Sequence, residues 1–201
     1  MVNTMMPAKK SGRSAEKSRC EWCLNDPLYI RYHDEEWGRP VHDDRVLFEF
    51  LILEGFQAGL SWLTVLKKRE NFRKAFAGFD ANKVAKFDAS KVESLMQDVG
   101  IIRNRLKIEA AITNARLFKA VQKEFGSFDK YVWGFTGGKT VVNNPCKPGD
   151  IPATSTIADA MSKDLGARGF KFRGSTICYA FMQAVGIVDD HVAGCWRKKS
   201  K

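Results

Sequence analysis

Apolar residues recur with a helical period along most of the chain after residue 43. Between 103 and 125 they form a stripe of Ile108, Ile112, Ala115 and Phe118, which predicts a long amphipathic helix. Polar capping residues at the start of other apolar segments predict further helices. These cover 43–57, 62–79 after Ser61, two short segments capped by Asp80 and Ser90 that end near Asp98, 127–134, 156–167 after a Thr156–Asp159 capping box, and 175–186.

Strand-like alternation is confined to about 139–143, so the predicted fold class is all-α. Residues 20–42 are aromatic without a clean period and contain Pro27 and Pro40, which predicts an ordered loop with short helical pieces. Residues 135–153 are rich in Gly, Asn and Pro and are predicted to form a loop.

One acidic residue interrupts an apolar helix face. Leu47, Phe50, Leu51, Glu54 and Ala58 are spaced by three, four, seven and eleven positions from the first, so the Glu54 carboxylate points the same way as the apolar side chains. A buried ionised carboxylate is costly unless something pairs with it. Two partners are open: a buried arginine of the same chain, or a bound ligand.

Size and charge narrow the class of protein. The 201 residues are 44% hydrophobic, enough for one domain with a real core. Eight of the ten net positive charges lie in residues 1–19 and 197–201, which are expected to be disordered basic tails around a nearly neutral domain at 20–196. The chain has no run of eighteen apolar residues and no signal peptide, so a cytoplasmic protein that is independent of membranes is expected. A monomer is also expected.

Cysteine and histidine residues cluster near both ends of the chain. Cys20, Cys23 and His33 lie near the start, whereas His191 and Cys195 lie near the end. An odd count of five cysteines argues against a disulfide framework, while four Cys or His side chains are typical of structural zinc sites. The spacing leaves open which of these residues would be ligands, and inert buried thiols remain the alternative.

The segment "QDVGIIRNRLKI" at 97–108 joins two predicted helices through Gly100. Glycine can take the left-handed conformation that a tight turn needs. Arg103, Arg105 and Lys107 follow at the start of the next helix, where free N–H groups can bind phosphate. This pattern is typical of a helix-hairpin-helix contact with the DNA backbone, although an ordinary helix turn with a solvated basic face is the alternative.

Aromatic residues surround Glu54 in the sequence. Trp22, Tyr29, Tyr32 and Trp37 precede its helix and Trp62 follows it. Aromatic faces stack on flat bases, and a carboxylate among them favours a hydrogen-bond donor or a cation. The set predicts a pocket for a flat, electron-poor ring, with ordinary core packing as the competing interpretation.

The chain resembles the 3-methyladenine DNA glycosylase I family, also called Tag. The resemblance rests on the stretches "DPLYIRYHDEEWG" (26–38), "LEGFQAGLSWLTVLKKRENFRKAF" (53–76), "DVGIIRNRLKI" (98–108) and "RGFKFRGSTICYAFMQAVGIVDDHVAGC" (168–195). It implies a helix-hairpin-helix glycosylase fold, whose substrate is double-stranded DNA containing alkylated bases. The expected reaction is hydrolysis of the N-glycosidic bond of 3-methyladenine after base flipping.

The resemblance also implies particular residues. It implies a structural zinc ion held by Cys20, His33, His191 and Cys195, with no cofactor for catalysis, and it makes Cys23 a bystander. The implied base pocket is built from Trp22, Tyr29, Tyr32, Trp37, Glu54 and Trp62, with Glu54 as the group that receives the adenine edge. The turn that contains Gly59 would enter DNA with Leu60 as an apolar wedge. Phe56 departs from the family, where glutamine is common.

The superfamily usually supplies a catalytic Asp or a nucleophilic Lys after the hairpin, and neither has a clear counterpart here. The expectation is therefore a monofunctional glycosylase without strand cleavage. A zinc-stabilised DNA-binding module without catalysis is the alternative function.

Overall fold

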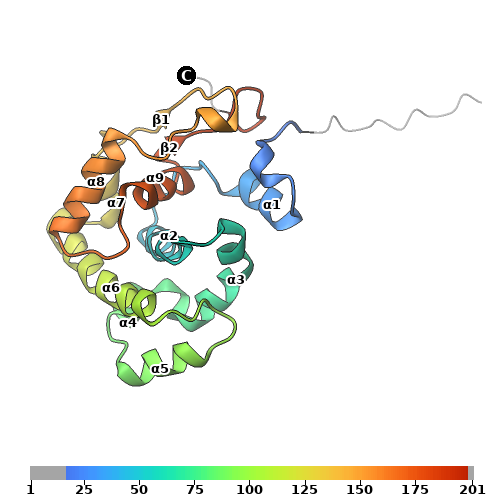
Figure 1. The fold of residues 1–201 in the computed structure, drawn as a ribbon. Helices are drawn as coiled ribbons and strands as arrows, with labels where there is room; N and C mark the ends of the chain where they lie inside the picture. The colour runs from blue at the N-terminus through green and yellow to red at the C-terminus, as the bar shows by residue number, and fades with distance from the viewer. Residues whose placement is uncertain (1–16, 199–201) are drawn as a thin grey trace, which may run out of the picture.

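Helices surround one central helix, α2 (Asp44–Gln57), in the computed structural model, which describes residues 17–198 (Figure 1). The other helices are α1 (Pro27–Glu35), α3 (Trp62–Ala75), α4 (Ala81–Val84), α5 (Ala89–Gln97), α6 (Arg105–Phe125), α7 (Phe128–Gly134), α8 (Thr156–Ala167) and α9 (Ser175–Ala184). Short 3-10 helices cover Glu21–Cys23, Ala77–Phe79 and Pro148–Asp150. Two short strands, β1 (Val141–Val142) and β2 (Val188–Asp189), pair in parallel. The predicted helical class is confirmed, and the alternation near 139–143 corresponds to β1.

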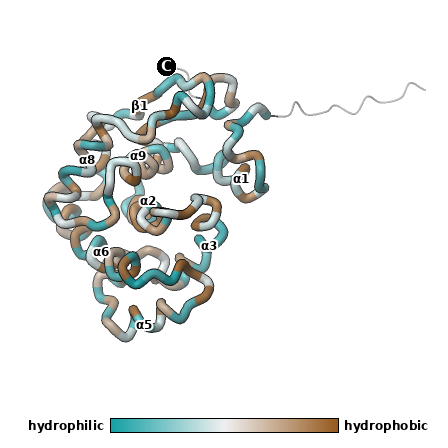
Figure 2. Tube along the Cα trace, viewed as in Figure 1, coloured by the Kyte–Doolittle hydropathy of each residue, from teal (hydrophilic) through white to brown (hydrophobic). Residues whose placement is uncertain are grey.

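Helix α2 is buried on all sides. Every residue from Leu47 to Phe56 is buried, because α3, α6, α7 and α9 pack around the helix. Its strongly apolar character is visible at the centre of Figure 2. The prediction of a single apolar face was too narrow, since a helix that is apolar all round belongs in a core. Glu54 is consequently enclosed whichever way the helix is rotated.

Most predicted capping residues are confirmed. The side chains of Asp43, Ser61 and Asp80 accept backbone N–H bonds at the starts of α2, α3 and α4. Ser90 and Thr156 were wrong, because Asp88 and Ser155 cap α5 and α8 one or two residues earlier. Both of these residues have extended backbone, which the first capping position requires.

Two segments begin differently from the prediction. Pro27 does not interrupt a loop but occupies the first turn of α1, where no backbone N–H is needed, and the Asp26 side chain caps that helix. Helix α6 starts at Arg105 with Asn104 as its cap, two residues later than predicted. Residues 101–104 therefore remain in the connection between α5 and α6.

The two ends of the described chain lie against each other. Arg19 forms an ion pair with Asp34, with 2.9 Å between Nη2 and Oδ2, and Lys17 lies over the Trp196 ring at 3.7 Å from its centroid. Lys17 and Arg19, which belong to the predicted N-terminal tail, thus contact residues of the domain. The rest of the predicted basic tails, 1–16 and 199–201, lies outside the described residues. Between residues 17 and 198 no helix has the length and apolarity needed to cross a membrane.

Candidate functional site

A cavity of about 350 Å³ opens between α1, α2, α9 and the start of α3. All six residues of the predicted base pocket line it: Trp22, Tyr29, Tyr32, Trp37, Glu54 and Trp62. They come from four separate segments, so only the folded chain brings them together.

The aromatic walls of the cavity support one another edge to face. The Trp22 ring lies 4.7 Å from Tyr29 and 5.0 Å from Trp37, measured between centroids, and Tyr32 lies 5.5 Å from Trp62. Burial, and then the nearby Glu54, raises the pKa of Tyr29 to about 12, and the same causes raise the pKa of Tyr32 further. Both hydroxyl groups are therefore hydrogen-bond donors at neutral pH.

Glu54 is 4% exposed and has no partner among the described residues. Its Oε2 atom is shielded from solvent and makes no hydrogen bond. Burial alone raises the pKa of the Glu54 carboxyl to about 8, so this group is mostly protonated at pH 7 in the ligand-free protein. The sequence left open a buried arginine as its partner; Arg69 is buried, but it pairs with Glu49 and Glu36.

Sequence reasoning missed part of the lining. Gln57, Pro148, Ile151, Ala180 and Gln183 complete the cavity. Gln57 lies one helical turn after Glu54 and could have been found by the same spacing argument. The others come from α9 and the 148–151 segment, and nothing in their local sequence marks them as neighbours of Glu54.

Phe56 faces the core. It is 1% exposed and its ring lies 4.7 Å from Phe72 and 5.8 Å from Phe76. It does not line the cavity. The departure at this position therefore adds aromatic packing between α2 and α3 and leaves the cavity walls unchanged.

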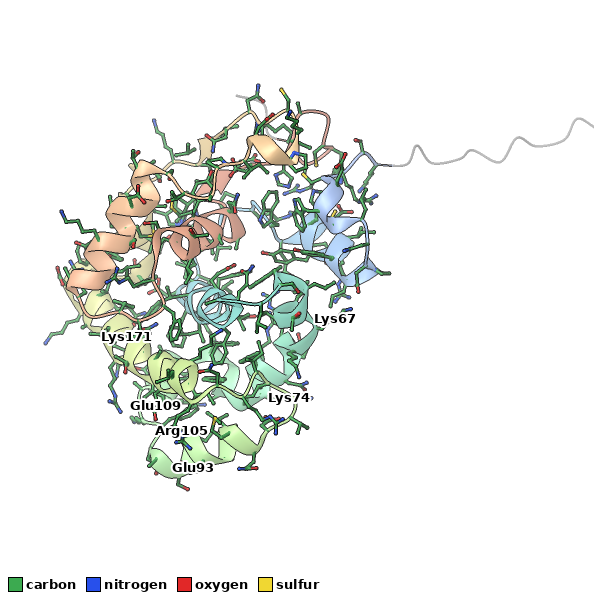
Figure 3. All side chains as sticks on the ribbon, in the orientation of Figure 1. Lys67, Lys74, Glu93, Arg105, Glu109 and Lys171 are labelled. Carbon is green, nitrogen blue, oxygen red and sulfur yellow. The ribbon has the colours of Figure 1, made fainter. Side chains whose placement is uncertain are left out.

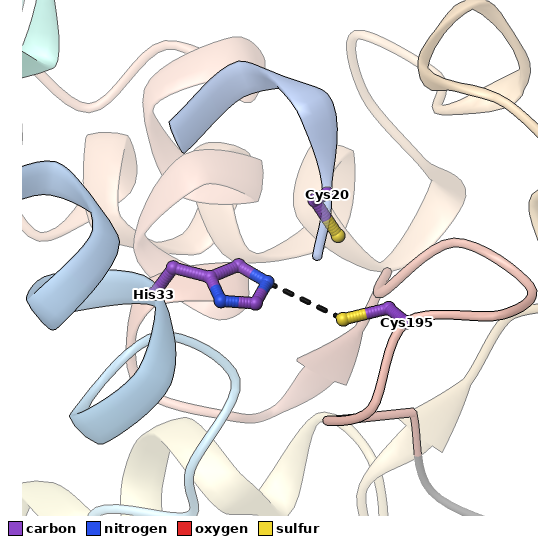
Figure 4. A group of neighbouring side chains, drawn as sticks. All are labelled: Cys20, His33 and Cys195. Carbon is purple, nitrogen blue, oxygen red and sulfur yellow. Dashed lines mark hydrogen bonds between the residues drawn. The ribbon is translucent and has the colours of Figure 1, made fainter. Parts of the chain in front are cut away.

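Three of the four predicted metal ligands converge at the junction of the chain ends. The Sγ atoms of Cys20 and Cys195 and a ring nitrogen of His33 all lie within 4.8 Å of one another. The Cys195 Sγ atom lies 3.4 Å from His33 Nε2 (Figure 4). Burial and the neighbouring Cys195 raise the pKa of Cys20 to about 12, so a thiolate here requires a nearby positive charge.

His191 stands beside this cluster, with its ring centroid 5.1 Å from that of His33. Each imidazole is oriented by a carboxylate, because His33 Nδ1 lies 2.8 Å from Asp34 and His191 Nδ1 lies 2.8 Å from Asp189. This leaves both Nε2 atoms as potential ligands, and His191 Nε2 is buried without a partner. Two thiols and two such imidazoles fit a tetrahedral metal ion.

Neighbouring residues adapt to the cluster. Gly38 has a φ of +73°, and a Cβ atom there would lie 2.7 Å from His191 Cε1, so only glycine fits. The Cys23 thiol donates to the Cys20 carbonyl oxygen at 3.1 Å. Trp37 contacts the His191 ring at 4.6 Å and also lines the cavity, so the two sites share a wall.

The residues predicted to contact phosphate lie in different environments. Arg103 is exposed, whereas Arg105 pairs with Glu93 of α5 at 2.8 Å, as Figure 3 illustrates. Gly100 does not have the left-handed backbone that was expected. Glycine is nevertheless needed there, because a Cβ atom would lie 2.9 Å from the Asp98 carboxylate and 3.0 Å from the Asn71 side chain.

Lys107 differs most from its prediction. It is buried, and its Nζ donates to the carbonyl oxygens of Phe56 at 2.9 Å and Ala58 at 2.6 Å. It thus satisfies carbonyls at the C-terminus of α2 and is no surface phosphate ligand. The turn that follows has Gly59 at a φ of +79° and ends in Leu60, whose side chain is 42% exposed. The structure therefore holds an exposed apolar side chain two residues after the Ala58 carbonyl that Lys107 of α6 contacts.

Comparison with known proteins gives consistent matches. Residues 22–198 match the family described as Methyladenine glycosylase. The chain is 52% identical over 177 residues to DNA-3-methyladenine glycosylase 1 of Escherichia coli (strain K12), covering 88% of this chain and 95% of that protein. A crystal structure of 3-methyladenine DNA glycosylase I superimposes with a TM-score of 0.88 at 50% identity, covering 90% of this chain and all of the other. A structure that addresses 3-methyladenine recognition by the Staphylococcus aureus enzyme has a TM-score of 0.88 at 37% identity, covering 91% and 97%.

Proposed function

The chain belongs to the methyladenine glycosylase family, and from that premise we propose that it is a DNA-3-methyladenine glycosylase acting in base-excision repair. It hydrolyses the bond between the alkylated base and deoxyribose. The observation that carries this proposal is Glu54: a buried carboxyl group without a protein partner, in a cavity walled by tryptophan and tyrosine. Such a group is costly to keep unless a ligand pairs with it.

The cavity suits a single flipped base. A volume of about 350 Å³ is at the small end of ligand pockets and exceeds what a purine needs. The aromatic walls stack on the base, with roughly 1–3 kcal/mol expected from each stacked ring. Glu54 accepts hydrogen bonds from the base edge, and a cationic alkylated base favours its ionised form. The positive charge of the base and the negative charge of ionised Glu54 thus stabilise each other in the cavity.

Little acid–base chemistry is required. Alkylation at ring nitrogen 3 makes the base a cation and a good leaving group, so the transition state resembles an oxocarbenium ion. Extraction of the base from the stack and positioning in the cavity supply much of the acceleration. Water attacks the sugar carbon. None of the described cavity residues is a lysine, which supports a monofunctional enzyme without a covalent Schiff base.

DNA binding involves the surface around the 58–61 turn. Leu60 enters the duplex as an apolar wedge beside the vacated stack. The connection between α5 and α6 acts as a helix-hairpin-helix element, with backbone N–H groups at the start of α6 and exposed Arg103 near phosphates. Lys107 contributes indirectly by holding the carbonyls that precede the wedge.

A structural zinc ion completes the proposal. Cys20, His33, His191 and Cys195 would hold it, and it would tie the two ends of the domain together without taking part in the reaction. Joining segments so distant in sequence restricts the unfolded chain strongly. The cavity and the metal cluster are each formed by residues of one chain, which supports a monomer. The five cysteines form no disulfide, which suits the reducing cytoplasm.

The test is chromatography of the bases released from methylated DNA. The proposal predicts free 3-methyladenine and an uncut DNA strand. A non-catalytic DNA-binding module would retain the DNA and release no base. A covalent adduct trapped with borohydride would contradict monofunctional hydrolysis and indicate a lyase.

A further inference from the structure

Consecutive aspartates in the segment "DDH" serve two different sites. Asp189 orients His191 at the metal cluster, as described above. Asp190 is 1% exposed, and its Oδ2 atom accepts hydrogen bonds from Tyr179 and Gln183 of α9, each at 2.7 Å. Its Oδ1 atom accepts from the amide of Asn143 at 2.8 Å. A buried carboxylate with three side-chain donors is a fixed acceptor.

This network determines which way the Gln183 amide faces. The amide has one donor end and one acceptor end of nearly the same shape. Because Nε2 donates one of its two N–H groups to Asp190, the amide nitrogen is fixed on the Asp190 side, and the carbonyl oxygen Oε1 lies at the other end of the amide. No donor among the described residues reaches Oε1, although Gln183 lines the cavity. Gln183 is therefore a cavity-lining residue whose Oε1 is an acceptor without a donor among the described residues.

We infer that Gln183, oriented by Asp190, is a specificity-determining residue that accepts a hydrogen bond from the exocyclic 6-amino group of the bound purine. The inference rests on the proposed glycosylase function and adds a residue to base recognition. Glu54 on α2 and Gln183 on α9 offer acceptors from two adjacent helices to one cavity. A 6-amino group can donate to such acceptors. A 6-oxo group is itself an acceptor, so it cannot pair with Oε1 and would leave Oε1 without a hydrogen bond.

Tyr179 supports this orientation. Burial and its bond to Asp190 raise the pKa of the Tyr179 hydroxyl, so this group stays a donor and holds the carboxylate in place. With Asp190 fixed by Tyr179 and Asn143, rotating the Gln183 amide by half a turn would bring its oxygen against a carboxylate oxygen. That repulsion disfavours the orientation in which the amide nitrogen would take the place of Oε1.

The test compares two free bases by calorimetric titration: 3-methyladenine, which has a 6-amino group, and 3-methylhypoxanthine, which has a 6-oxo group. Gln183→Met is expected to weaken 3-methyladenine binding about tenfold, the value of one good hydrogen bond. Binding of 3-methylhypoxanthine should change less than about twofold, so the discrimination between the bases falls. Asp190→Asn should lower discrimination by a smaller factor, because both amide orientations become available.

The matched control is Gln122→Met. Gln122 also donates its amide to a carboxylate, that of Asp44 at 2.6 Å, but it lies outside the cavity. It should leave both affinities unchanged. Equal loss for both bases in Gln183→Met, or no loss for either, would overturn the inference. Failure of the unsubstituted protein to bind 3-methyladenine would instead contradict the proposed function.

If Gln183→Met does not fold, Asp190→Asn decides by the same ratio of affinities, with its fold checked by thermal melting. An unchanged ratio in the folded Asp190→Asn protein would contradict the orienting role of that carboxylate.

Discussion

Two glutamates on the central helix α2 are both buried, but only one of them has charged partners. Glu49 is 7% exposed and receives Arg69 at 2.5 Å and Arg73 at 2.8 Å. Glu54 is 4% exposed, lies five residues later and has no partner among residues 17–198. The first charge is neutralised by α3, whereas the second faces a cavity. The comparison separates a carboxylate that serves the fold from one that is left for a ligand.

The same distinction recurs at the chain ends. His33 and His191 each have a carboxylate on Nδ1, yet His191 Nε2 is buried without a partner. Buried polar atoms in native proteins are nearly always paired, so unpaired ones point to something that binds. Among residues 17–198, Glu54 Oε2 and His191 Nε2 are two of four such atoms, the others being Trp62 Nε1 and Arg197 Nε.

The largest expected effect comes from removing the paired glutamate. Glu49→Ala would leave the buried Arg69 with only Glu36 as a carboxylate partner. Breaking such a buried pair should lower the free energy of unfolding by about 3 kcal/mol. Chemical denaturation measures this loss. Under conditions where the variant is folded, its affinity for 3-methyladenine should be unchanged, and a selective loss of binding at unaltered stability would reverse the assignment of roles.

The metal cluster should give an effect of similar size. Combining Cys20→Ala with His191→Ala removes two proposed ligands, and the melting temperature should fall by roughly 10 °C for a loss of about 3 kcal/mol in a chain of this size. Elemental analysis of the unsubstituted protein should give about one zinc ion per chain. Cys146→Ser is the control, because that thiol is exposed and lies outside the cluster. An unaltered melting temperature in the double variant would argue against a structural metal.

Much of the candidate site was readable in the sequence. Local spacing identified Glu54 as a misfit, and the resemblance selected aromatic residues that do line one cavity. Caps such as Asp43 and Ser61 were predictable because capping depends on a few neighbouring residues. Lys107 was misassigned for a physical reason: its exposure depends on how α6 packs against the end of α2, which no local pattern encodes.

Gln183 was missed for a related reason. Its orientation is set by Asp190 on the segment after α9 and by Asn143 from the strand region, so three separate segments determine one amide. The burial of α2 on all sides was likewise invisible to periodicity, since a continuous apolar run does not reveal how many neighbours will cover it.

A smaller effect is expected in the pH dependence of stability. The pKa of Glu54 rises from about 4.5 in the unfolded chain to about 8 in the fold. Between these values the unfolded state has lost the proton and the folded state keeps it, so stability falls as pH rises through this window. Within this window the loss should be roughly 1.4 kcal/mol for each unit of pH. Comparing melting at pH 5 and pH 8 in Glu54→Gln should reveal a flatter profile, and identical slopes would mean that Glu54 ionises normally.

The smallest effect is expected at an exposed glutamate of the same ion-pair network. Glu70 also pairs with Arg73, at 2.6 Å, but its side chain is 74% exposed. Glu70→Ala should change the free energy of unfolding by less than about 0.5 kcal/mol, because exposed ion pairs contribute little. Denaturation beside Glu49→Ala measures the contrast. Comparable losses in the two variants would show that burial is not what distinguishes these carboxylates.

The most direct test of the central claim is calorimetric titration of 3-methyladenine into the protein and its Glu54→Gln variant, with zinc content checked in both. A carboxylate that receives the base edge predicts at least tenfold weaker binding in the variant, since a hydrogen bond to a charged group contributes about 1.5–3 kcal/mol. The thermal stability of the variant should be preserved. Equal affinity in the two proteins would contradict a role of Glu54 in base recognition.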